Sequence, residues 1–242
     1  MSHDQNDRRR IAPLVVKIGG SLLSNGSRLS TVVATLARAR RPIVIVPGGG
    51  PFADQVREAQ KIHDTSDQAA HRMALMAMQQ TGLLIEDMQV RFTAVDTTSA
   101  IRQALAANRI PIWLPLKLAG VDETIPADWT VTSDALAARL AERLRFEGVL
   151  LLKSRCVPQG PSAAELASLG VVDEVFGEVV ARAGLAFRVI GPGEERALAE
   201  ICLATPPMSV ASVSVRRPCA RTDRSRRGAR RAMGGPSAYH RH

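Results

Sequence analysis

The stretch that decides the fold is Leu-Val-Val-Lys-Ile-Gly-Gly-Ser at residues 14–21, which is echoed by Ile-Val-Ile-Val-Pro-Gly-Gly-Gly at residues 43–50. Each stretch is a short apolar run that ends in glycines and is followed by a helical pattern of hydrophobic residues. This order is typical of a parallel sheet whose strands end at turns that face helix N-termini. Because glycine has no Cβ, the amide groups of such a turn can approach an anion closely. Two such turns, one with a lysine, therefore predict a protein that binds phosphate.

Strand and helix patterns alternate from residue 12 to residue 204, which predicts one α/β domain: a three-layer αβα sandwich with a mostly parallel central sheet. Strands are expected at residues 13–18, 43–46, 92–95, 110–114, 149–153 and 187–190. Helices are expected at residues 29–40, 51–63, 67–80, 97–108, 133–144, 171–183 and 194–202. Residues 1–11 and the arginine-rich tail at residues 205–242 lack this periodicity, and we expect both to be disordered.

The net charge of +9 is concentrated at the C-terminal end of the chain. Residues 206–242 contain nine arginines and one acidic residue, Asp223, so this segment carries +8 and the rest of the chain is close to neutral. Such a tail can bind polyanions without sequence specificity. We therefore expect no nucleic-acid partner except non-specifically through the tail, which is more simply explained as a solvated appendage.

Other features of the composition predict a cytoplasmic protein. Its three cysteines are widely spaced, which is neither a disulfide framework nor a zinc-binding pattern and suits a reducing compartment. No run of about 18 uninterrupted apolar residues is present, so no membrane partner is expected. His63 and His71 lie eight residues apart in helical segments, and we expect them to face solvent and not to bind a metal.

Two lysines lie at the ends of apolar strands, at the edge of the sheet where ligands of open α/β folds bind. Lys17 lies in the first glycine-containing stretch, and Lys153 ends the strand at residues 149–153. Only four of the 32 basic residues of the chain are lysines, so arginine is its default surface cation. A lysine at each strand end is therefore expected to serve chemistry, because a compact, mobile ammonium suits a phosphate oxygen.

The second glycine cluster and the segment at residues 129–137 supply further candidate groups. Three consecutive glycines after a strand are costly to order, which favours a loop against which a phosphate sits. In the segment Trp-Thr-Val-Thr-Ser-Asp-Ala-Leu-Ala, the oxygens of Thr132, Ser133 and Asp134 are equally suited to capping a helix and to binding a ligand. The sequence contains no P-loop, dinucleotide-binding or protein-kinase motif.

Taken together, in this order and spacing, these segments resemble the amino acid kinase superfamily, which includes acetylglutamate, carbamate, aspartate, uridylate and isopentenyl phosphate kinases. The resemblance covers residues 12–203 and implies transfer of a phosphoryl group from ATP to a carboxylate or a phosphate, with Mg²⁺ held mainly by the phosphates of ATP. It implies that Lys17 and Lys153 neutralise the transferred group, while Asp134 holds the two lysines in place.

The resemblance also divides the remaining candidate residues between two ligands. Phosphate or ATP binding is expected at Gly19, Gly20, Ser21 and Ser154, and substrate binding at Gly48, Gly49, Gly50, Asp54, Thr132 and Ser133. The implied partner is a small phosphorylated molecule. Members of this fold commonly associate, so we also expect a homo-oligomer, with the methionine-rich helix at residues 67–80 as the first place to look for its interface.

Residues 46–54 (Val-Pro-Gly-Gly-Gly-Pro-Phe-Ala-Asp) and residues 129–137 most resemble one branch, the [5-(aminomethyl)furan-3-yl]methyl phosphate kinases of methanofuran biosynthesis. In that branch the acceptor is already a phosphate monoester and the product is a diphosphate. Isopentenyl phosphate kinases usually carry a histidine beside their glycine-rich loop, whereas Pro47 and Pro51 stand here. A uridylate or isopentenyl phosphate kinase, and a non-catalytic protein that binds nucleotides or oxyanions, are the alternatives.

The aminomethyl group of such an acceptor is cationic and favours a carboxylate in its pocket. Asp54, shortly after the second glycine cluster, is the first candidate for this carboxylate, and Asp128 is the second. The alternative, which we favour for Asp54, is that its charge only stabilises the first turn of its helix through the helix dipole.

Overall fold

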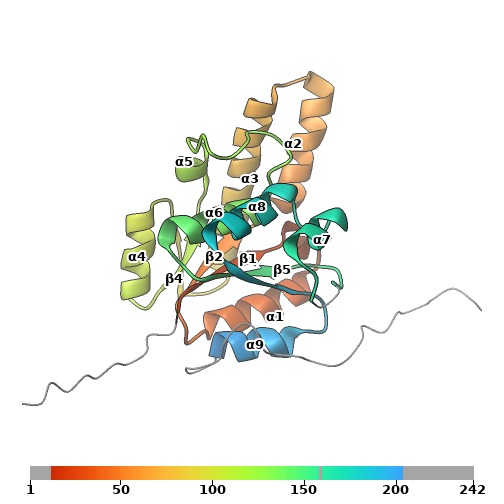
Figure 1. The fold of residues 1–242 in the computed structure, drawn as a ribbon. Coiled ribbons are helices and arrows are strands. Elements are labelled where there is room, and N and C mark those ends of the chain that lie inside the picture. The colour runs from red at the N-terminus through yellow and green to blue at the C-terminus, as the bar shows by residue number, and fades with distance from the viewer. Residues whose placement is uncertain (1–11, 158–159, 204–242) are drawn as a thin grey trace, which may run out of the picture.

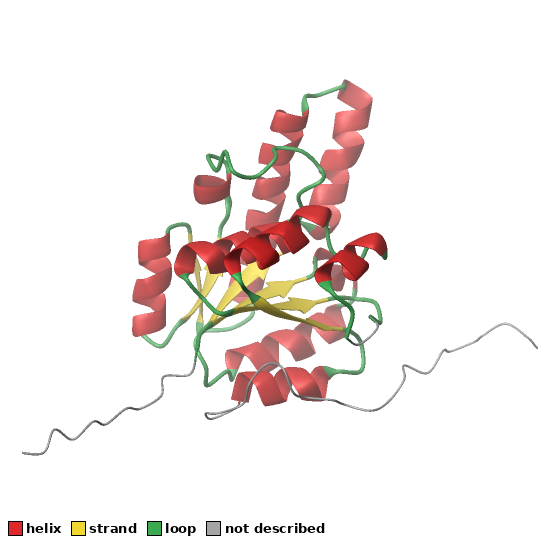
Figure 2. Ribbon diagram, in the orientation of Figure 1, coloured by secondary structure: helices red, strands yellow, loops and turns green. Residues whose placement is uncertain are grey.

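The core of the computed structural model, which describes residues 12–157 and 160–203, is a six-stranded sheet in which all paired strands are parallel (Figures 1 and 2). The strand order is β3-β4-β2-β1-β5-β6. The strands are β1 (Leu14–Ile18), β2 (Ile43–Pro47), β3 (Phe92–Val95), β4 (Ile110–Trp113), β5 (Gly148–Leu152) and β6 (Ala186–Ile190). Helices cover both faces of this sheet, which confirms the predicted α/β fold class.

Helices follow nearly every strand of the described ranges. They are the 3₁₀ helix η1 (Gly20–Ser24) and the α-helices α1 (Gly26–Ala37), α2 (Gly50–His63), α3 (Asp67–Asp87), α4 (Thr98–Ala106), α5 (Leu116–Ala119), α6 (Ser133–Leu144), α7 (Ala163–Ser168), α8 (Glu174–Ala183) and α9 (Glu195–Leu203). Helices α2 and α3 form a hairpin that projects beyond the sheet (Figure 1). None of these helices is both long and apolar enough to span a membrane. The expected disorder of residues 1–11 and 205–242 concerns residues outside the described ranges.

Alternate residues of the central strand β1 enter two separate hydrophobic cores. Leu14, Val16 and Ile18 pack on the face covered by α1 and α9, whereas Val15 packs on the face covered by α6 and α8. Successive side chains of a strand point to opposite faces, and a parallel sheet buried on both faces needs apolar residues at every position. This is why the strand sequences read as continuous apolar runs.

The structure differs from the sequence predictions mainly at helix ends and in short helices. Helix α8 begins at Glu174, three residues later than predicted, because Asp173 is its N-cap and accepts a hydrogen bond from the amide of Phe176. Helix α7 was not predicted, although Ser162 and Glu165 form a capping box, for which the Ser-x-x-Glu pattern is the sequence signal. Helix α3 continues to Asp87, past the predicted end at residue 80.

The parallel register brings the ends of β1, β2 and β5 level with one another. Ile18 at the end of β1 pairs with Pro47 on one side and with Leu152 on the other. The residues that follow, including both glycine clusters and Lys153, therefore meet at one edge of the sheet. From β1 the chain continues to β2 on one side, whereas from the neighbouring strand β5 it continues to β6 on the other side. Such a switch point is where open α/β sheets bind ligands.

The two glycine turns at this edge lie in direct backbone contact. A Cβ on Gly20 would overlap the backbone of Gly50, and a Cβ on Gly48 would overlap the backbone of Gly20. Gly50 also has a φ of +53°, a conformation that other residues rarely adopt. The turns therefore need glycine in order to pack against each other, whether or not they also bind a ligand.

Replacement of Gly20 by alanine should lower the free energy of unfolding by about 1–3 kcal/mol, because the added methyl forces two backbone segments apart. Gly26 is the matched control, since a Cβ there meets nothing within 4 Å. Chemical denaturation of both variants measures the difference. Equal stability of Gly20→Ala and Gly26→Ala would contradict the packing argument.

Candidate active site

A cavity of about 680 Å³ lies where the carboxyl ends of β1 and β5 meet the α2–α3 hairpin and the N-terminal ends of α6 and α8. It brings together most of the residues predicted from the sequence. The predicted residues that line it are Lys17, Gly20, Ser21, Gly49, Gly50, Asp54, Thr132, Ser133, Asp134 and Lys153. Gly19, Gly48 and Ser154 are not part of its wall.

At the base of this cavity, one buried carboxylate binds two lysines. Asp134 lies 2.7 Å from the Nζ of Lys17 through Oδ1 and 2.5 Å from the Nζ of Lys153 through Oδ2. Lys17 and Asp134 are only 5% and 3% exposed. The two lysines come from neighbouring strands, and Asp134 comes from the first turn of α6, so three elements meet at this carboxylate.

The pKa values of the cluster reflect competition between burial and charge. Burial and the neighbouring Lys17 lower the pKa of Lys153 to about 8, against the opposing effect of Asp134. Burial alone would raise the pKa of Asp134, but the two lysines outweigh it and lower that pKa below its usual value. Asp134 is therefore a stable anion and a poor proton acceptor, whereas Lys153 is mostly protonated at neutral pH and loses its proton at mildly alkaline pH.

A second carboxylate, which the sequence analysis did not identify, ties α6 to α8. Asp173 Oδ2 accepts hydrogen bonds from the amide and the hydroxyl of Thr132, at 3.0 and 2.6 Å, and from the amide of Ala135 at 3.1 Å. Its Oδ1 accepts the amide of Phe176 at 2.7 Å. Burial, with the charge of Asp134, raises the pKa of Asp173 despite these bonds. The only sequence signal for it is an Asp at a helix N-cap, which was hidden inside a helix predicted to start too early.

Thr132 caps a helix, and it also lines the cavity. It is the N-cap of α6, and its hydroxyl accepts a hydrogen bond from the amide of Asp134 while donating to Asp173. Of the two roles that the sequence left open for Thr132, the structure shows capping. Capping fixes the turn that carries Asp134, so it also orients the carboxylate toward the lysines.

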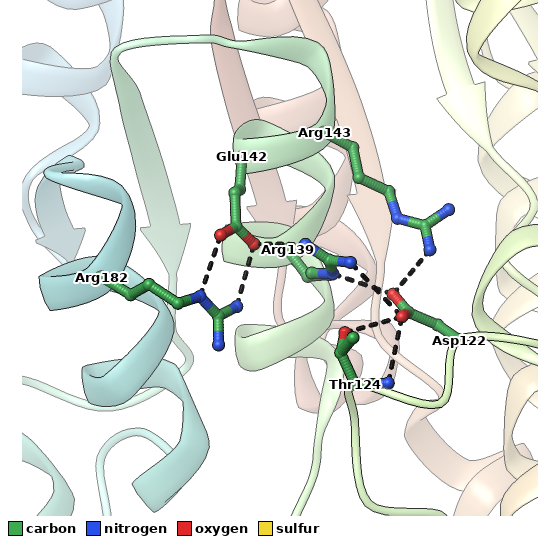
Figure 3. A network of polar contacts seen from close by, with 6 residues as sticks. All are labelled: Asp122, Thr124, Arg139, Glu142, Arg143 and Arg182. Atoms are coloured by element: carbon green, nitrogen blue, oxygen red, sulfur yellow. Dashed lines mark hydrogen bonds and ion pairs between the residues drawn. The ribbon is translucent and has the colours of Figure 1, made fainter.

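The far end of α6 is held by an arginine network (Figure 3). Asp122 binds Arg139 at 2.8 Å and Arg143 at 2.9 Å, and Glu142 links Arg139 to Arg182 of α8. Burial raises the pKa of Asp122, but hydrogen bonds from Arg139 and from Thr124 outweigh it and bring the value to about 2. The network fixes α6 against α8 and against the loop that leads to residues 128–132.

Lys153 is also held in place through its backbone carbonyl. Arg28 of α1 donates from Nη1 to the carbonyl of Lys153 at 2.7 Å, and its Nε lies 3.2 Å from Glu195 of α9. The next residue, Ser154, is joined to Ser21 by a hydrogen bond of 2.7 Å between the hydroxyls. The segments that follow β1 are therefore bound to the chain at Lys153 and at Ser154.

The glycines that do not line the cavity have their amides engaged in the sheet edge. Gly19 donates to the carbonyl of Leu152, and Gly48 donates to the carbonyl of Ile18, both at 2.9 Å. In this conformation neither amide is free for an anion, so the expected hydrogen bonds from these two residues are replaced by contacts that extend the sheet. Gly20 and Gly49 line the cavity, and their expected contacts with phosphate stay predictions.

The candidate carboxylate Asp54 lies at the rim of the cavity. Its side chain is 70% exposed and lies 3.0 Å from Arg57, one turn later in α2. The Arg57 guanidinium also stacks over the ring of Trp129, 4.1 Å from the ring centroid, and the Trp129 indole N–H donates to Gln60 at 2.5 Å. Asp54 therefore has a cationic partner within its own helix.

One expectation about histidine is wrong. His63 is exposed, as predicted, but His71 is 9% exposed and forms part of the cavity wall on α3. The prediction failed because helical periodicity alone does not show the α2–α3 hairpin. Arg57 and Gln60 of α2 contact Trp129. His71 of α3 lines the same cavity as Trp129. Within the described ranges, no group of three or more His, Cys, Asp or Glu side chains is arranged to hold a metal ion.

This combination of a parallel sheet, paired glycine turns and a lysine–aspartate–lysine cluster defines a phosphate-handling α/β protein. Residues 12–154, more than half of the chain, match the amino acid kinase family, and the chain belongs to that family. It is 30% identical over 138 residues to the [5-(aminomethyl)furan-3-yl]methyl phosphate kinase of Methanocaldococcus jannaschii. That alignment covers 57% of this chain and 63% of the relative, which is less than two thirds of its length.

Solved structures of the same fold include uridylate kinases. The enzyme from Archaeoglobus fulgidus superposes with a TM-score of 0.59 at 14% identity, covering 79% of this chain and 95% of that one. The UMP kinase of Ureaplasma parvum gives a TM-score of 0.60 at 16% identity, with the same coverage of each chain. At such low identity these similarities establish the fold only.

Replacement of Asp134 by asparagine should lower the pKa of Lys153 below its value of about 8, because Asp134 is the charge that opposes burial and Lys17. With only four lysines in the chain, ¹³C-NMR of labelled lysine side chains can follow each Cε across a pH titration. Asp54→Asn is the control, since that carboxylate contacts neither lysine. An unchanged Lys153 titration in Asp134→Asn would show that the ion pair does not hold in solution.

Proposed function

We propose that this chain is a cytoplasmic ATP-dependent kinase that converts a phosphate monoester into a diphosphate, with [5-(aminomethyl)furan-3-yl]methyl phosphate as its acceptor. The observation that carries the proposal is the buried cluster of Lys17, Asp134 and Lys153 in a cavity bordered by two glycine turns. The similarity to the Methanocaldococcus jannaschii enzyme supports the choice of acceptor. We further propose that residues 12–204 form one kinase domain.

The cluster is suited to phosphoryl transfer because that reaction depends mainly on positioning and on neutralising charge. When bound, ATP supplies the transferred phosphoryl group, and Mg²⁺ accompanies its phosphates. Lys17 and Lys153 offer two ammonium groups to the oxygens of that group from neighbouring strands. Asp134 keeps the two ammonium groups at fixed positions, since each of its oxygens contacts one of them.

A phosphate acceptor also explains why the site needs no general base. The second pKa of a phosphate monoester is about 6, so its attacking oxygen is already ionised at neutral pH. Asp134 is poorly suited to accept a proton, because two lysines hold its pKa below the usual value. The chemistry therefore asks the protein to overcome repulsion between two anions, which is what two lysines and the glycine-turn amides can do.

The walls of the cavity suggest where each ligand binds. The side formed by Ser21, Lys153 and the residues before α8 would hold the phosphates of ATP, and the side formed by Gly49, Gly50 and α3 would hold the acceptor. Ser154 supports the ATP side from outside the cavity through its hydrogen bond with Ser21. Both sides converge on Lys17, as transfer between two bound phosphates requires.

In the test, ATP consumption is measured with the furan phosphate, UMP and isopentenyl phosphate in parallel. We expect turnover of the furan phosphate alone, and at least a 100-fold loss of kcat in Lys153→Ala, because removing one preorganised charge costs about 2.7–4 kcal/mol of transition-state stabilisation. Lys61→Ala is the matched control, since Lys61 lies at the end of α2, outside this cavity.

Turnover of UMP or isopentenyl phosphate instead would contradict the acceptor but keep the reaction class. Binding of ATP without turnover of any acceptor would favour the non-catalytic alternative. Full activity in Lys153→Ala would contradict the role of the cluster itself.

We also propose that the protein is a homo-oligomer that associates through α3. Met76 and Leu83 are 50% and 52% exposed and lie seven residues apart, so they share one face of the helix. Leu84, 41% exposed, extends this apolar stripe. An exposed apolar face on a long helix is typical of a surface that a second copy covers.

A double substitution of Met76 and Leu83 by lysine should convert the oligomer into a monomer, because four charges would face one another in a two-fold interface. Size-exclusion chromatography with light scattering measures the mass. Leu169→Lys is the control, since Leu169 is an equally exposed apolar residue that follows α7. A wild-type chain that is monomeric at micromolar concentration would contradict the proposal.

A further inference from the structure

His71 is a buried titratable residue that lines the cavity without a role in the phosphate chemistry described above and without a hydrogen-bond partner among the described residues. Glu174 also lines the cavity without such a partner, but it is exposed and lies in the first turn of α8, away from α3. It lies on the cavity face of α3, one turn before Leu75 and two turns before Met78, which also line the cavity. These neighbours make the wall around it largely apolar. The imidazole is therefore the main polar group that this part of α3 offers to a ligand.

The position of His71 along α3 places it away from the phosphate-binding end of the cavity. Ala77 packs beside Gly49, and the hydroxyl of Thr81 donates to the Gly49 carbonyl at 3.5 Å, so this part of the helix marks the level of the glycine turn. His71 precedes Ala77 by six residues, which is about 9 Å along a helix axis. A ligand whose phosphate lies at the glycine turn would reach His71 with its opposite end.

The electrostatic surroundings of His71 favour a hydrogen-bond donor with positive charge. Burial lowers the pKa of His71, so the ring is neutral at physiological pH and one nitrogen can accept a hydrogen bond. The carboxylate of Asp128 is close enough to affect this pKa, while hydrogen bonds from Thr130 lower its own. The negative charge of this carboxylate disfavours a phosphate and favours an ammonium, which can donate a hydrogen bond to the neutral imidazole.

The nearby arginine does not reverse this preference. Arg57 lines the same cavity, but its guanidinium is paired with Asp54 and stacked on Trp129. Its charge is thus compensated within α2. The same pairing makes Asp54 a weaker candidate than His71 for binding a cationic group, because Asp54 is exposed and already bound.

We propose that His71, supported by the charge of Asp128, determines acceptor specificity by accepting a hydrogen bond from a primary ammonium at the end of the acceptor opposite its phosphate. This inference rests on the proposed function and defines its substrate class: a phosphate monoester whose compact apolar body ends in a cationic amine. A five-membered ring with one-carbon arms on opposite sides has this form. His71 binds the acceptor and takes no part in the transfer itself.

The experiment compares two acceptors, [5-(aminomethyl)furan-3-yl]methyl phosphate and its hydroxymethyl analogue, in the wild type and in His71→Phe. Phenylalanine keeps a ring of similar size and removes both nitrogens. We expect the wild type to prefer the amine, and His71→Phe to lose about tenfold or more of that preference, mainly through KM. The KM for ATP should change by less than about twofold.

Two further variants keep the result interpretable. His63→Phe is the matched control, because His63 is exposed and does not line the cavity. Asp128→Asn tests the same idea without replacing a residue of the cavity wall and keeps the amide oxygen that can accept from Thr130, and we expect a smaller loss of preference in the same direction. If His71→Phe fails to fold by thermal melting, Asp128→Asn decides: an unchanged preference would overturn the proposal.

Failure of this inference and failure of the proposed function give different results. Turnover of both furans with equal kcat/KM in the wild type would overturn the inference and leave the kinase intact. If neither furan is turned over, the proposed acceptor is wrong, and calorimetric binding of the two compounds still measures the preference. Tighter binding of the amine that disappears in His71→Phe would support His71, and equal binding would overturn it.

Discussion

The buried carboxylate of Asp134 is the group on which the rest of the site depends. Moving two ammonium groups and one carboxylate out of water costs several kcal/mol for each ion, which only close contact between them offsets. With both contacts made, the negative charge of Asp134 is balanced against the positive charges of two lysines. No other cation of the described residues contacts Asp134. The charge of Asp173 offsets part of the remaining positive charge, since it raises the pKa of Lys153, and the rest faces a cavity that an anion can enter.

Much of the surrounding structure serves to keep that carboxylate in place. The parallel register pairs Lys17 with Leu151, two residues before Lys153, so both lysines lie near the ends of neighbouring strands. Thr132 and Asp173 fix the first turn of α6, and the arginine network fixes its far end (Figure 3). Asp134 therefore sits at the end of a helix anchored at both ends, which is the arrangement that precise charge positioning requires.

The sequence predicted residues of the candidate site at positions where only one physical reason explains the residue type. Lysines at strand ends, among far more numerous arginines, predicted two of the three residues of the cluster, and the glycine clusters predicted the edge of the sheet. The sequence could not show that Gly48 is needed for backbone contact with Gly20, because close packing and anion binding favour the same residue. The placement of Asp173 at the site depends on contacts between α6 and α8, and that of His71 depends on contacts between α3 and the loop before α6. Such long-range contacts leave no local pattern in the sequence.

If the proposed function holds, the chemistry of the site and its recognition of an acceptor fall on different parts of the structure. Charge neutralisation comes from the sheet edge, where backbone pairing and buried ion pairs allow little variation. The wall that faces the rest of the acceptor comes from the α2–α3 hairpin, which projects beyond the sheet and contributes to its hydrophobic cores mainly through its base (Figure 1). A residue such as His71 can therefore change without disturbing the lysines. Under the proposed function, the search for determinants of specificity is therefore directed to α3 rather than to the glycine turns.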